Sequence, residues 1–262
     1  MKDKLVNLHI IGAQKSGTTA LAYFLQQHNN IYVVDGKEAH IFDSPAFLHS
    51  HKKMKHARVE YAAKLSQYKG EEYICDATPI TWFSPTFLKH CYAYNNAAKF
   101  IVVLRNPIER ALSHYRMSVN KGHESRSFLT ALLLEHFRLA RYKNNLSFQS
   151  PWRHQSYLTR GCYAPQLRNL FDTIPADQVL LLNQEALIKK HNTVLKSVFQ
   201  FLNLPYQSIA PERIFCSEKT KVTTNIFFGK CYAKSYYWLK RENHKYWRAI
   251  IENASKTADG QN

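Results

Sequence analysis

One segment near the N-terminus constrains the fold more than any other, because a strand-like run, a glycine-containing turn and a helical pattern follow one another directly. It reads LHIIGAQKSGTTALAYFLQQH over residues 8–28. Such a turn places backbone N–H groups at the N-terminus of a helix, where unsatisfied donors and the helix dipole favour an anion. Glycine permits a sharp turn and close approach to a ligand, and lysine adds a mobile positive charge. The segment predicts a phosphate site made by Gly12, Lys15, Ser16, Gly17, Thr18 and Thr19.

The order of residues in this turn separates two classes of phosphate site. In the Walker pattern GxxxxGK[ST] the lysine follows the second glycine, whereas here Lys15 precedes Gly17. A P-loop kinase also needs a magnesium-binding carboxylate at a strand end. The most hydrophobic strand-like run, FIVVL, is instead followed by Arg105. Both observations weigh against a P-loop nucleotide kinase, which stays open as an alternative.

A second anion site is indicated by KFIVVLRNPIERALSHYR over residues 99–116, which again has the pattern of a strand, a turn and a helix. Arg105, at the carboxyl end of the strand, can offer a bidentate fork to a phosphate. Ser113, eight positions later on the helix, would point back over the same crevice. Two anion sites at two strand-to-helix turns suit a nucleotide that is phosphorylated at both its 3′ and 5′ positions.

The rest of the sequence alternates short apolar runs with longer helical patterns, which is typical of an α/β protein. The runs FIVVL and VLLL are continuous, as expected of central strands covered on both faces. We therefore expect a P-loop-like central parallel sheet flanked by helices on both faces. The expected strands are residues 5–11, 31–34, 73–75, 100–104 and 179–182. The expected helices are residues 18–28, 107–121, 128–142, 163–171 and 193–202, with a basic helical connection within 52–69.

Length and composition favour one domain over residues 1–262, because 45% hydrophobic content in 262 residues can fill one large core. The core is expected within residues 5–230, and an amphipathic helix with a polar tail within 232–262. No run of eighteen apolar residues and no secretory cleavage site occurs, so we expect a cytoplasmic protein without a transmembrane segment. Five scattered cysteines without a CxxC spacing predict reduced thiols and no metal site.

The charge balance favours anionic partners without choosing among them. The chain has 36 Lys and Arg against 19 Asp and Glu, a formal net charge of +17. No nucleic-acid-binding module is recognisable, so nucleic acid is not an expected partner. A non-catalytic module that binds anions or nucleic acid stays open as an alternative, as does a basic face that serves only solubility.

The two phosphate motifs resemble those of sulfotransferases that use 3′-phosphoadenosine 5′-phosphosulfate (PAPS). The order Lys-Ser-Gly-Thr-Thr resembles the 5′-phosphosulfate loop, and the spacing of Arg105 and Ser113 resembles the 3′-phosphate motif; the fit is closest to the heparan-sulfate-type domain and its bacterial relatives. The resemblance implies PAPS as donor, 3′-phosphoadenosine 5′-phosphate (PAP) as product, and no metal. It also implies an acceptor hydroxyl or amine on a carbohydrate, glycan or related metabolite, which the positive charge suggests to be acidic.

The same resemblance suggests the catalytic groups. GKEAHIFD, residues 36–43, is similar to the family's KExHFFD segment, in which the glutamate is the proposed base. Glu38 would then take the acceptor proton, and Lys15 would stabilise the charge that builds on the sulfuryl and bridging oxygens. If the segment is extended, His40 lies on the same face as Glu38 and is an alternative base or an orienting partner.

Three further segments complete the comparison with the family. TRGCYAPQL, residues 159–167, resembles an RGxYAxQL segment, which would place Arg160 near the phosphates and Tyr163 near the nucleotide. The loop SEKTKVTT stands where the family closes a basic loop over the cofactor, so Lys219 and Lys221 are candidates there. CDATPITWFSP, residues 75–85, resembles EKTPxYF, but Ala77 replaces the family's lysine near the sulfuryl group. The cation at that point must come from elsewhere or be dispensable.

The spacing of Arg105 and Ser113 predicts a ligand preference. PAP should raise Tm much more than AMP or ADP, because PAP alone of the three carries a 3′-phosphate. A ligand at 100 times its Kd stabilises the fold by about 2.7 kcal/mol, which corresponds to roughly 5 °C or more in Tm. Differential scanning fluorimetry with the three nucleotides at equal concentration measures the shifts. Equal shifts would count against the assignment.

Overall fold

The computed structural model of the protein describes residues 5–142, 145, 147–212, 214 and 225–240. Its contacts group these residues into two compact units. The first contains residues 5–104 and 166–214, and the second contains 105–165 and 225–240. Each unit is described by itself, and the predicted extent of one domain over residues 1–262 stays a prediction.

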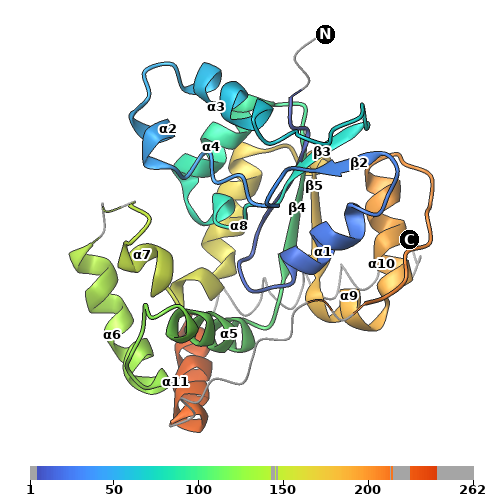
Figure 1. Cartoon of the computed structure of the whole chain (residues 1–262). Helices are drawn as coiled ribbons and strands as arrows, with labels where there is room; N and C mark the ends of the chain where they lie inside the picture. The colour runs from blue at the N-terminus through green and yellow to red at the C-terminus, as the bar shows by residue number, and fades with distance from the viewer. Residues whose placement is uncertain (1–4, 143–144, 146, 213, 215–224, 241–262) are drawn as a thin grey trace. The chain divides into compact units, whose positions relative to one another are not determined.

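The first unit is built on a five-stranded sheet whose paired neighbours all run parallel, in the order β2-β3-β1-β4-β5 (Figure 1). Its register sets His9 of β1 between Asp76 of β3 and Phe100 of β4. Nearly every residue of β1 and β4 is buried, as expected for strands covered on both faces. The strands are β1 Leu8–Gly12, β2 Ile31–Val33, β3 Tyr73–Asp76, β4 Lys99–Leu104 and β5 Val179–Asn183.

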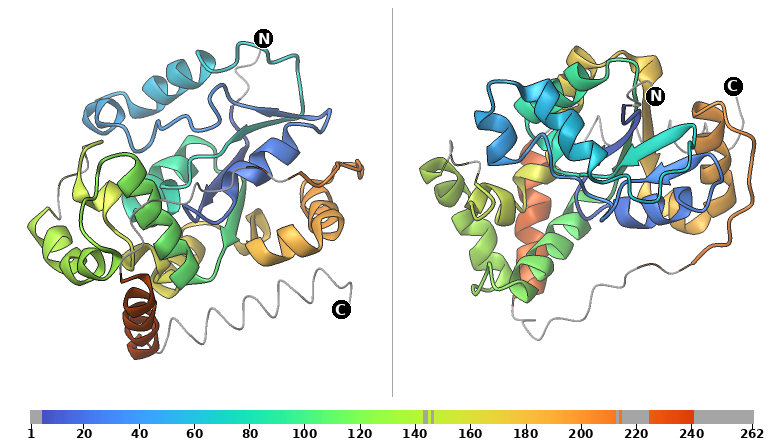
Figure 2. Two further views of the ribbon diagram at one scale, coloured as in Figure 1. Left: turned by 60° about the horizontal axis from the view of Figure 1, so that its bottom comes forward. Right: turned by 45° about the horizontal axis from the view of Figure 1, so that its top comes forward.

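Helices pack on both faces of this sheet (Figure 2). One face buries aliphatic side chains of β1, β4 and β5 against α1 (Thr18–Leu25), α9 (Gln184–Lys189) and α10 (His191–Phe201). On the other face the ring of His9 meets Phe42, whose own neighbours are aromatic rings of the helices α2 (Pro45–His49), α3 (Lys53–Ala62) and α4 (Pro85–Tyr94). The predicted α/β class is confirmed. The remaining elements of this unit are η1 (Thr81–Phe83), most of α8 (Tyr163–Thr173) and η3 (Ala176–Gln178).

The parallel strands decide where function can lie in this unit. Because β1, β2 and β3 run in the same direction, the turns that follow them leave from the same edge of the sheet. These turns are residues 13–17, 34–44 and 77–84. They bring the predicted phosphate turn, the segment of Glu38 and the segment of Ala77 to one edge.

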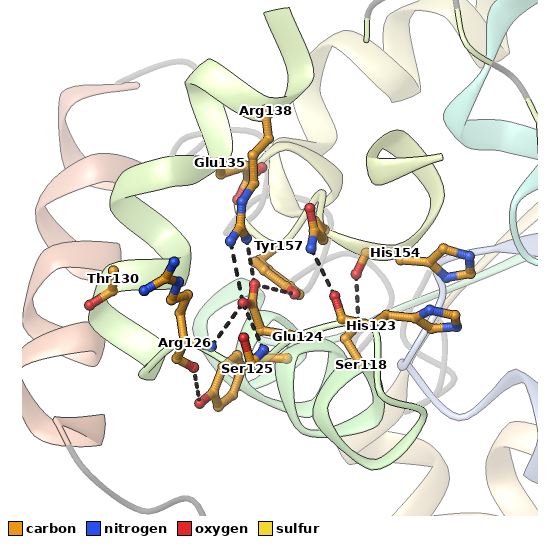
Figure 3. A network of polar contacts seen from close by, with 12 residues as sticks. Ser118, His123, Glu124, Ser125, Arg126, Thr130, Glu135, Arg138, His154 and Tyr157 are labelled. Atoms are coloured by element: carbon orange, nitrogen blue, oxygen red, sulfur yellow. Dashed lines mark hydrogen bonds and ion pairs between the residues drawn. The ribbon is translucent and has the colours of Figure 1, made fainter. Parts of the chain in front are cut away.

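The second unit is helical and is held together by buried carboxylates (Figure 3). Glu124 accepts hydrogen bonds from the hydroxyl of Tyr157 at 3.1 Å and from the guanidinium of Arg138. Glu135 accepts from the backbone N–H groups of Leu158 and Thr159 at 2.6 and 2.8 Å. Ion pairing and hydrogen bonds offset the cost of burying these charges. The elements are α5 (Pro107–Asn120), α6 (Phe128–Arg141), α7 (Pro151–His154), η2 (Thr159–Gly161), the first turn of α8, and α11 (Ile226–Leu239).

The prediction for the last helix was wrong at its start. Residue 232 was expected to begin it, whereas α11 begins at Ile226 and contains Gly229. A Cβ on Gly229 would lie 2.4 Å from the ring of Phe128, so glycine here allows α11 to approach α6 instead of ending a helix. The expected polar tail lies outside the described residues. Among the described helices, none combines the length and the apolar character that a membrane crossing requires.

Gly12 also owes its identity to packing. A Cβ at this position would lie 2.3 Å from the buried indole of Trp82. We therefore expect Gly12→Ala to lower the free energy of unfolding by about 1–3 kcal/mol, as overpacked sites usually do. Urea denaturation measures the loss, and a Trp82→Ala background should reduce it, because the two side chains would no longer compete for space. An unchanged unfolding free energy with weaker PAP binding would instead return Gly12 to a purely ligand-facing role.

Candidate active site

The turn after β1 has the backbone of an anion site. Lys15 and Gly17 both adopt positive φ, 68° and 95°, on either side of Ser16. Such alternation turns successive N–H groups toward one point. α1 then begins at Thr18 with Gly17 as N-cap and without a side-chain cap. The first N–H groups of this helix therefore lack the side-chain acceptor that usually satisfies one of them.

Ser16 supplies a second, independent observation at this turn. Ser16 is fully buried, and its hydroxyl has no hydrogen-bond partner among the described residues. A buried hydroxyl without a partner is costly, and such groups in native structures usually answer to a ligand or an ordered water. The donor set of Lys15, Ser16 and the N-terminus of α1 fits a phosphate or sulfate group.

A chain of polar contacts starts in α1 and passes through the loop after β2. The ammonium of Lys37 donates to the hydroxyl of Thr19 at 2.9 Å and forms an ion pair with one carboxylate oxygen of Glu38. The other oxygen of Glu38 lies 3.1 Å from Nε2 of His40. Nδ1 of His40 lies 2.9 Å from the buried carboxylate of Asp43. The chain thus runs from the predicted phosphate site to Asp43.

The charges in this chain decide which residue can act as a base. Burial lowers the pKa of His40, but hydrogen bonds to Asp43 and Glu38 outweigh it and raise that pKa to about 9. For the carboxyl of Glu38 burial acts in the opposite direction and raises the pKa, but the contacts with His40 and Lys37 outweigh burial and bring this pKa below its ordinary value. At neutral pH Glu38 is therefore a carboxylate and His40 an imidazolium. Of the two candidates, Glu38 can accept a proton and His40 orients it.

The loop that carries these residues is not extended, so the premise that placed Glu38 and His40 on one face was wrong, although the two side chains do meet. Lys37 and His40 have φ values of 69° and 53°, in the left-handed region that non-glycine residues avoid. Tight turns fold the backbone here, with the N–H of Lys37 bonded to the carbonyl of Val34 at 2.8 Å. Surrounding contacts must hold such a conformation in place.

The end of β3 provides those contacts. The buried carboxylate of Asp76 accepts from the N–H of Ala39 at 3.1 Å and from the hydroxyl of Thr78 at 2.6 Å. That hydroxyl in turn accepts from the N–H of His40 at 3.3 Å, and the N–H of Ala77 donates to the carbonyl of Lys37 at 3.0 Å. Burial raises the pKa of Asp76, and hydrogen bonds oppose the shift. β3 therefore clamps the loop before and after Glu38.

In the second unit, one predicted 3′-phosphate residue, Arg105, lies just before α5, and the other, Ser113, lies in the middle of that helix. The hydroxyl of Tyr163 donates to the carbonyl of Arg105 at 2.9 Å, so this fully buried tyrosine positions the backbone of the arginine. Burial lowers the pKa of Arg105; Glu109 opposes this, and the nearby cations of Arg110 and Arg116 add to it. A concentration of guanidinium groups favours an anion. Ser113 lies on α5 and is buried.

Arg160 has a different environment from the one expected of a phosphate ligand. It is buried, and its guanidinium donates to the hydroxyl of Ser156 at 2.7 Å and to the carbonyls of Arg153 and Trp152 at 3.1 and 3.3 Å. These bonds tie η2 to α7 and to the residues that follow it, which favours a structural role, so the place of Arg160 at the cofactor stays a prediction. Lys219 and Lys221 lie outside the described residues.

Sequence reasoning missed the parts played by Lys37, Asp43, Asp76 and Thr78. Asp43 ends the segment that contains Glu38, and this proximity was the only signal available for it. Asp76 and Thr78 act through backbone groups about forty positions away in the chain, which no local pattern reveals.

A known protein family and a solved structure match most of this chain. The family model described as "Sulfotransferase domain" matches residues 6–249. The chain belongs to the sulfotransferase family. A sulfotransferase from Alicyclobacillus acidocaldarius, known from its crystal structure, superposes with a TM-score of 0.67 and 25% sequence identity, over 82% of this chain and 87% of that one. The resemblance inferred from the motifs is thereby confirmed.

Among curated relatives, this sulfotransferase is similar to enzymes named for heparan sulfate. Human heparan sulfate glucosamine 3-O-sulfotransferase 3B1 is 28% identical over 214 residues, which are 81% of this chain and 49% of that protein. The bifunctional heparan sulfate N-deacetylase/N-sulfotransferase 1 of Caenorhabditis elegans is 28% identical over 210 residues, which are 78% of this chain and 23% of that protein. The chain thus spans half or less of the length of these relatives.

His40 of this sulfotransferase should stay protonated to a higher pH than an ordinary histidine does. Nitrogen-detected NMR titration of the imidazole should give a pKa near 9 instead of 6.5, and Asp43→Asn should lower it. Because the folded pKa exceeds the unfolded one, the stabilisation from His40 is complete below pH 6.5 and is lost as pH rises through about 9. The difference in unfolding free energy between wild type and His40→Gln should therefore shrink over that range. A pKa near 6.5 would restore His40 as a candidate base.

Proposed function

We propose that this sulfotransferase moves a sulfuryl group from PAPS to a hydroxyl or amine of a carbohydrate acceptor. The observation that carries the proposal is the contact of the Glu38 carboxylate with Lys37, whose ammonium also donates to Thr19 in the first turn of α1. A proton acceptor is thus connected to an anion site by one side chain. Transfer of a sulfuryl group needs both a site that binds the anionic donor and, close to it, a base that takes the proton of the acceptor.

The donor assignment rests on the chemistry of each unit taken separately. The turn of Lys15, Ser16 and Gly17 would bind the 5′-phosphosulfate, whose oxygens would satisfy the buried hydroxyl of Ser16. Arg105 and Ser113 would bind the 3′-phosphate, which would offset the mutual repulsion of the arginines around Arg105. No metal takes part in the proposed reaction, and PAP is its nucleotide product.

In the proposed reaction Glu38 accepts the proton of the acceptor while the acceptor oxygen or nitrogen forms a bond to sulfur. The bond between sulfur and the bridging phosphate oxygen breaks, and its electron pair leaves with PAP. Lys15 stabilises the charge that develops on the leaving oxygen, the role that preorganised cations play in phosphoryl transfer. His40 remains protonated throughout and keeps the second oxygen of Glu38 in place.

The acceptor class is proposed from the relatives and from charge. The two curated relatives are named for transfer to oxygen and to nitrogen of heparan sulfate, so both positions stay within the proposal. A formal net charge of +17 suits an acidic glycan. The match to the sulfotransferase family model over residues 6–249 weighs against both the kinase and the non-catalytic module. The cytoplasmic location expected from the sequence stays a prediction.

Glu38→Gln should separate binding from turnover. Removing a general base costs roughly 100-fold or more in kcat, whereas PAP affinity should stay within about threefold, because Glu38 does not belong to either phosphate site. Transfer from radiolabelled PAPS to heparan sulfate and to its N-deacetylated form measures the rate, and calorimetry measures PAP binding. The exposed Glu60→Gln on α3 is the matched control and should behave as wild type. A variant at Glu38 with undiminished kcat would remove this residue from the mechanism.

A further inference from the structure

Position 77 is unusual because this chain has alanine where the similar EKTPxYF segment of the sulfotransferase family has lysine. In the structure Ala77 is fully buried, and its N–H donates to the carbonyl of Lys37 at 3.0 Å. The two positions, forty residues apart in sequence, are therefore neighbours across one backbone hydrogen bond. A cation that is missing at one of them can be supplied from the other.

The ammonium of Lys37 lies where such a cation would be useful. It contacts the hydroxyl of Thr19, in the first turn of the helix that follows the phosphate turn, and the carboxylate of Glu38. Its side chain is 19% exposed, so solvent screens it only in part. An ammonium has three N–H donors. Among the described residues it has these two contacts, which leaves one donor for an oxygen of a ligand.

A purely structural ion pair does not explain this placement. His40 already holds the other oxygen of Glu38, and each added cation lowers the pKa of Glu38 and makes it a weaker base. The backbone of Lys37 is also held in the left-handed region, with φ of 69°, which costs free energy for a side chain with a Cβ. A second cation beside the base makes chemical sense if it also acts on the group being transferred.

We propose that Lys37 is a catalytic residue whose ammonium stabilises the sulfuryl oxygens during transfer, in place of the lysine absent at Ala77. The proposal rests on the proposed sulfotransferase reaction. As the acceptor bond to sulfur forms and the bond from sulfur to the phosphate oxygen breaks, negative charge shifts across the sulfuryl group and the leaving oxygen. The ammonium donates a hydrogen bond to a sulfuryl oxygen without giving up its proton. PAP, which has no sulfuryl group, gains nothing from this contact.

Lys37→Met tests the proposal, because methionine keeps an unbranched side chain and removes the charge. The plateau of kcat above pH 7 should fall roughly 100-fold, the usual cost of losing one donor to a developing charge, while the Kd of PAP stays within about threefold. If Lys37 served only to hold Glu38, its loss would raise the pKa of Glu38 and leave that plateau unchanged or higher. An unchanged plateau overturns the inference. Lys55→Met, on the exposed side of α3, is the matched control.

A charge transplant gives a second, independent reading. In the Lys37→Met background, Ala77→Lys should recover at least about tenfold of the lost kcat, since the new ammonium would start from the neighbouring backbone position. Ala77→Met in the same background adds bulk without charge and should recover nothing. Because position 77 is buried, circular dichroism and PAP binding check that each double variant is folded. Equal rates for the two folded double variants would count against the proposal.

A further variant covers the case in which substitutions at position 77 do not fold. Lys37→Arg retains a cation and should lose less than Lys37→Met at the same pH. Equal losses for arginine and methionine would show that charge is not what matters and would overturn the inference. Wild-type protein that transfers no radiolabelled sulfuryl group from PAPS to a panel of carbohydrate acceptors, both heparan substrates included, would overturn the proposed function itself. Active wild type with an unaffected Lys37→Met plateau overturns the inference alone.

Discussion

The parallel pairing of β1 with β3 is the constraint on which the rest of the first unit depends. Its register sets Leu8 opposite Cys75 and His9 opposite Asp76, so both strands end at the same edge of the sheet. The phosphate turn continues from one strand, and the clamp on the loop of Glu38 continues from the other. A shift of one residue in this register would turn Asp76 away from Ala39 and release the loop.

In the loop after β2, hydrogen bonds and ion pairs outweigh burial in setting the charges of Glu38 and His40. Burial alone would favour a neutral Glu38 and a neutral His40, an arrangement in which only the histidine could take a proton. The contacts with Lys37 and Asp43 reverse both tendencies and fix one anion beside two cations. The proposed division of labour, with Glu38 as base and His40 as its orienting partner, is therefore a property of the folded loop and not of the two residue types.

How much the sequence predicts follows from the distance over which each contact acts. All five strands were placed to within three residues at each end, since continuous apolar runs such as FIVVL report burial directly. The turn between β1 and α1 could be predicted because its residues are consecutive, and its binding of a phosphate stays a prediction. The pairing of Ala77 with Lys37, and the contact of Gly12 with Trp82, depend on tertiary approach and leave no periodic signal. The start of α11 was missed because Gly229, usually a weak helix former, is selected there by Phe128.

The left-handed backbone at Lys37 and His40 has a consequence for how such a protein evolves. Glycine or asparagine would adopt these φ values at lower conformational cost, so a sequence under selection for stability alone would drift toward them. Such drift would ease the strain and remove both cations beside Glu38. The presence of Lys37 and His40 in a conformation that suits glycine fits the proposed reaction, because stability is lost at these positions and two cations are gained beside Glu38.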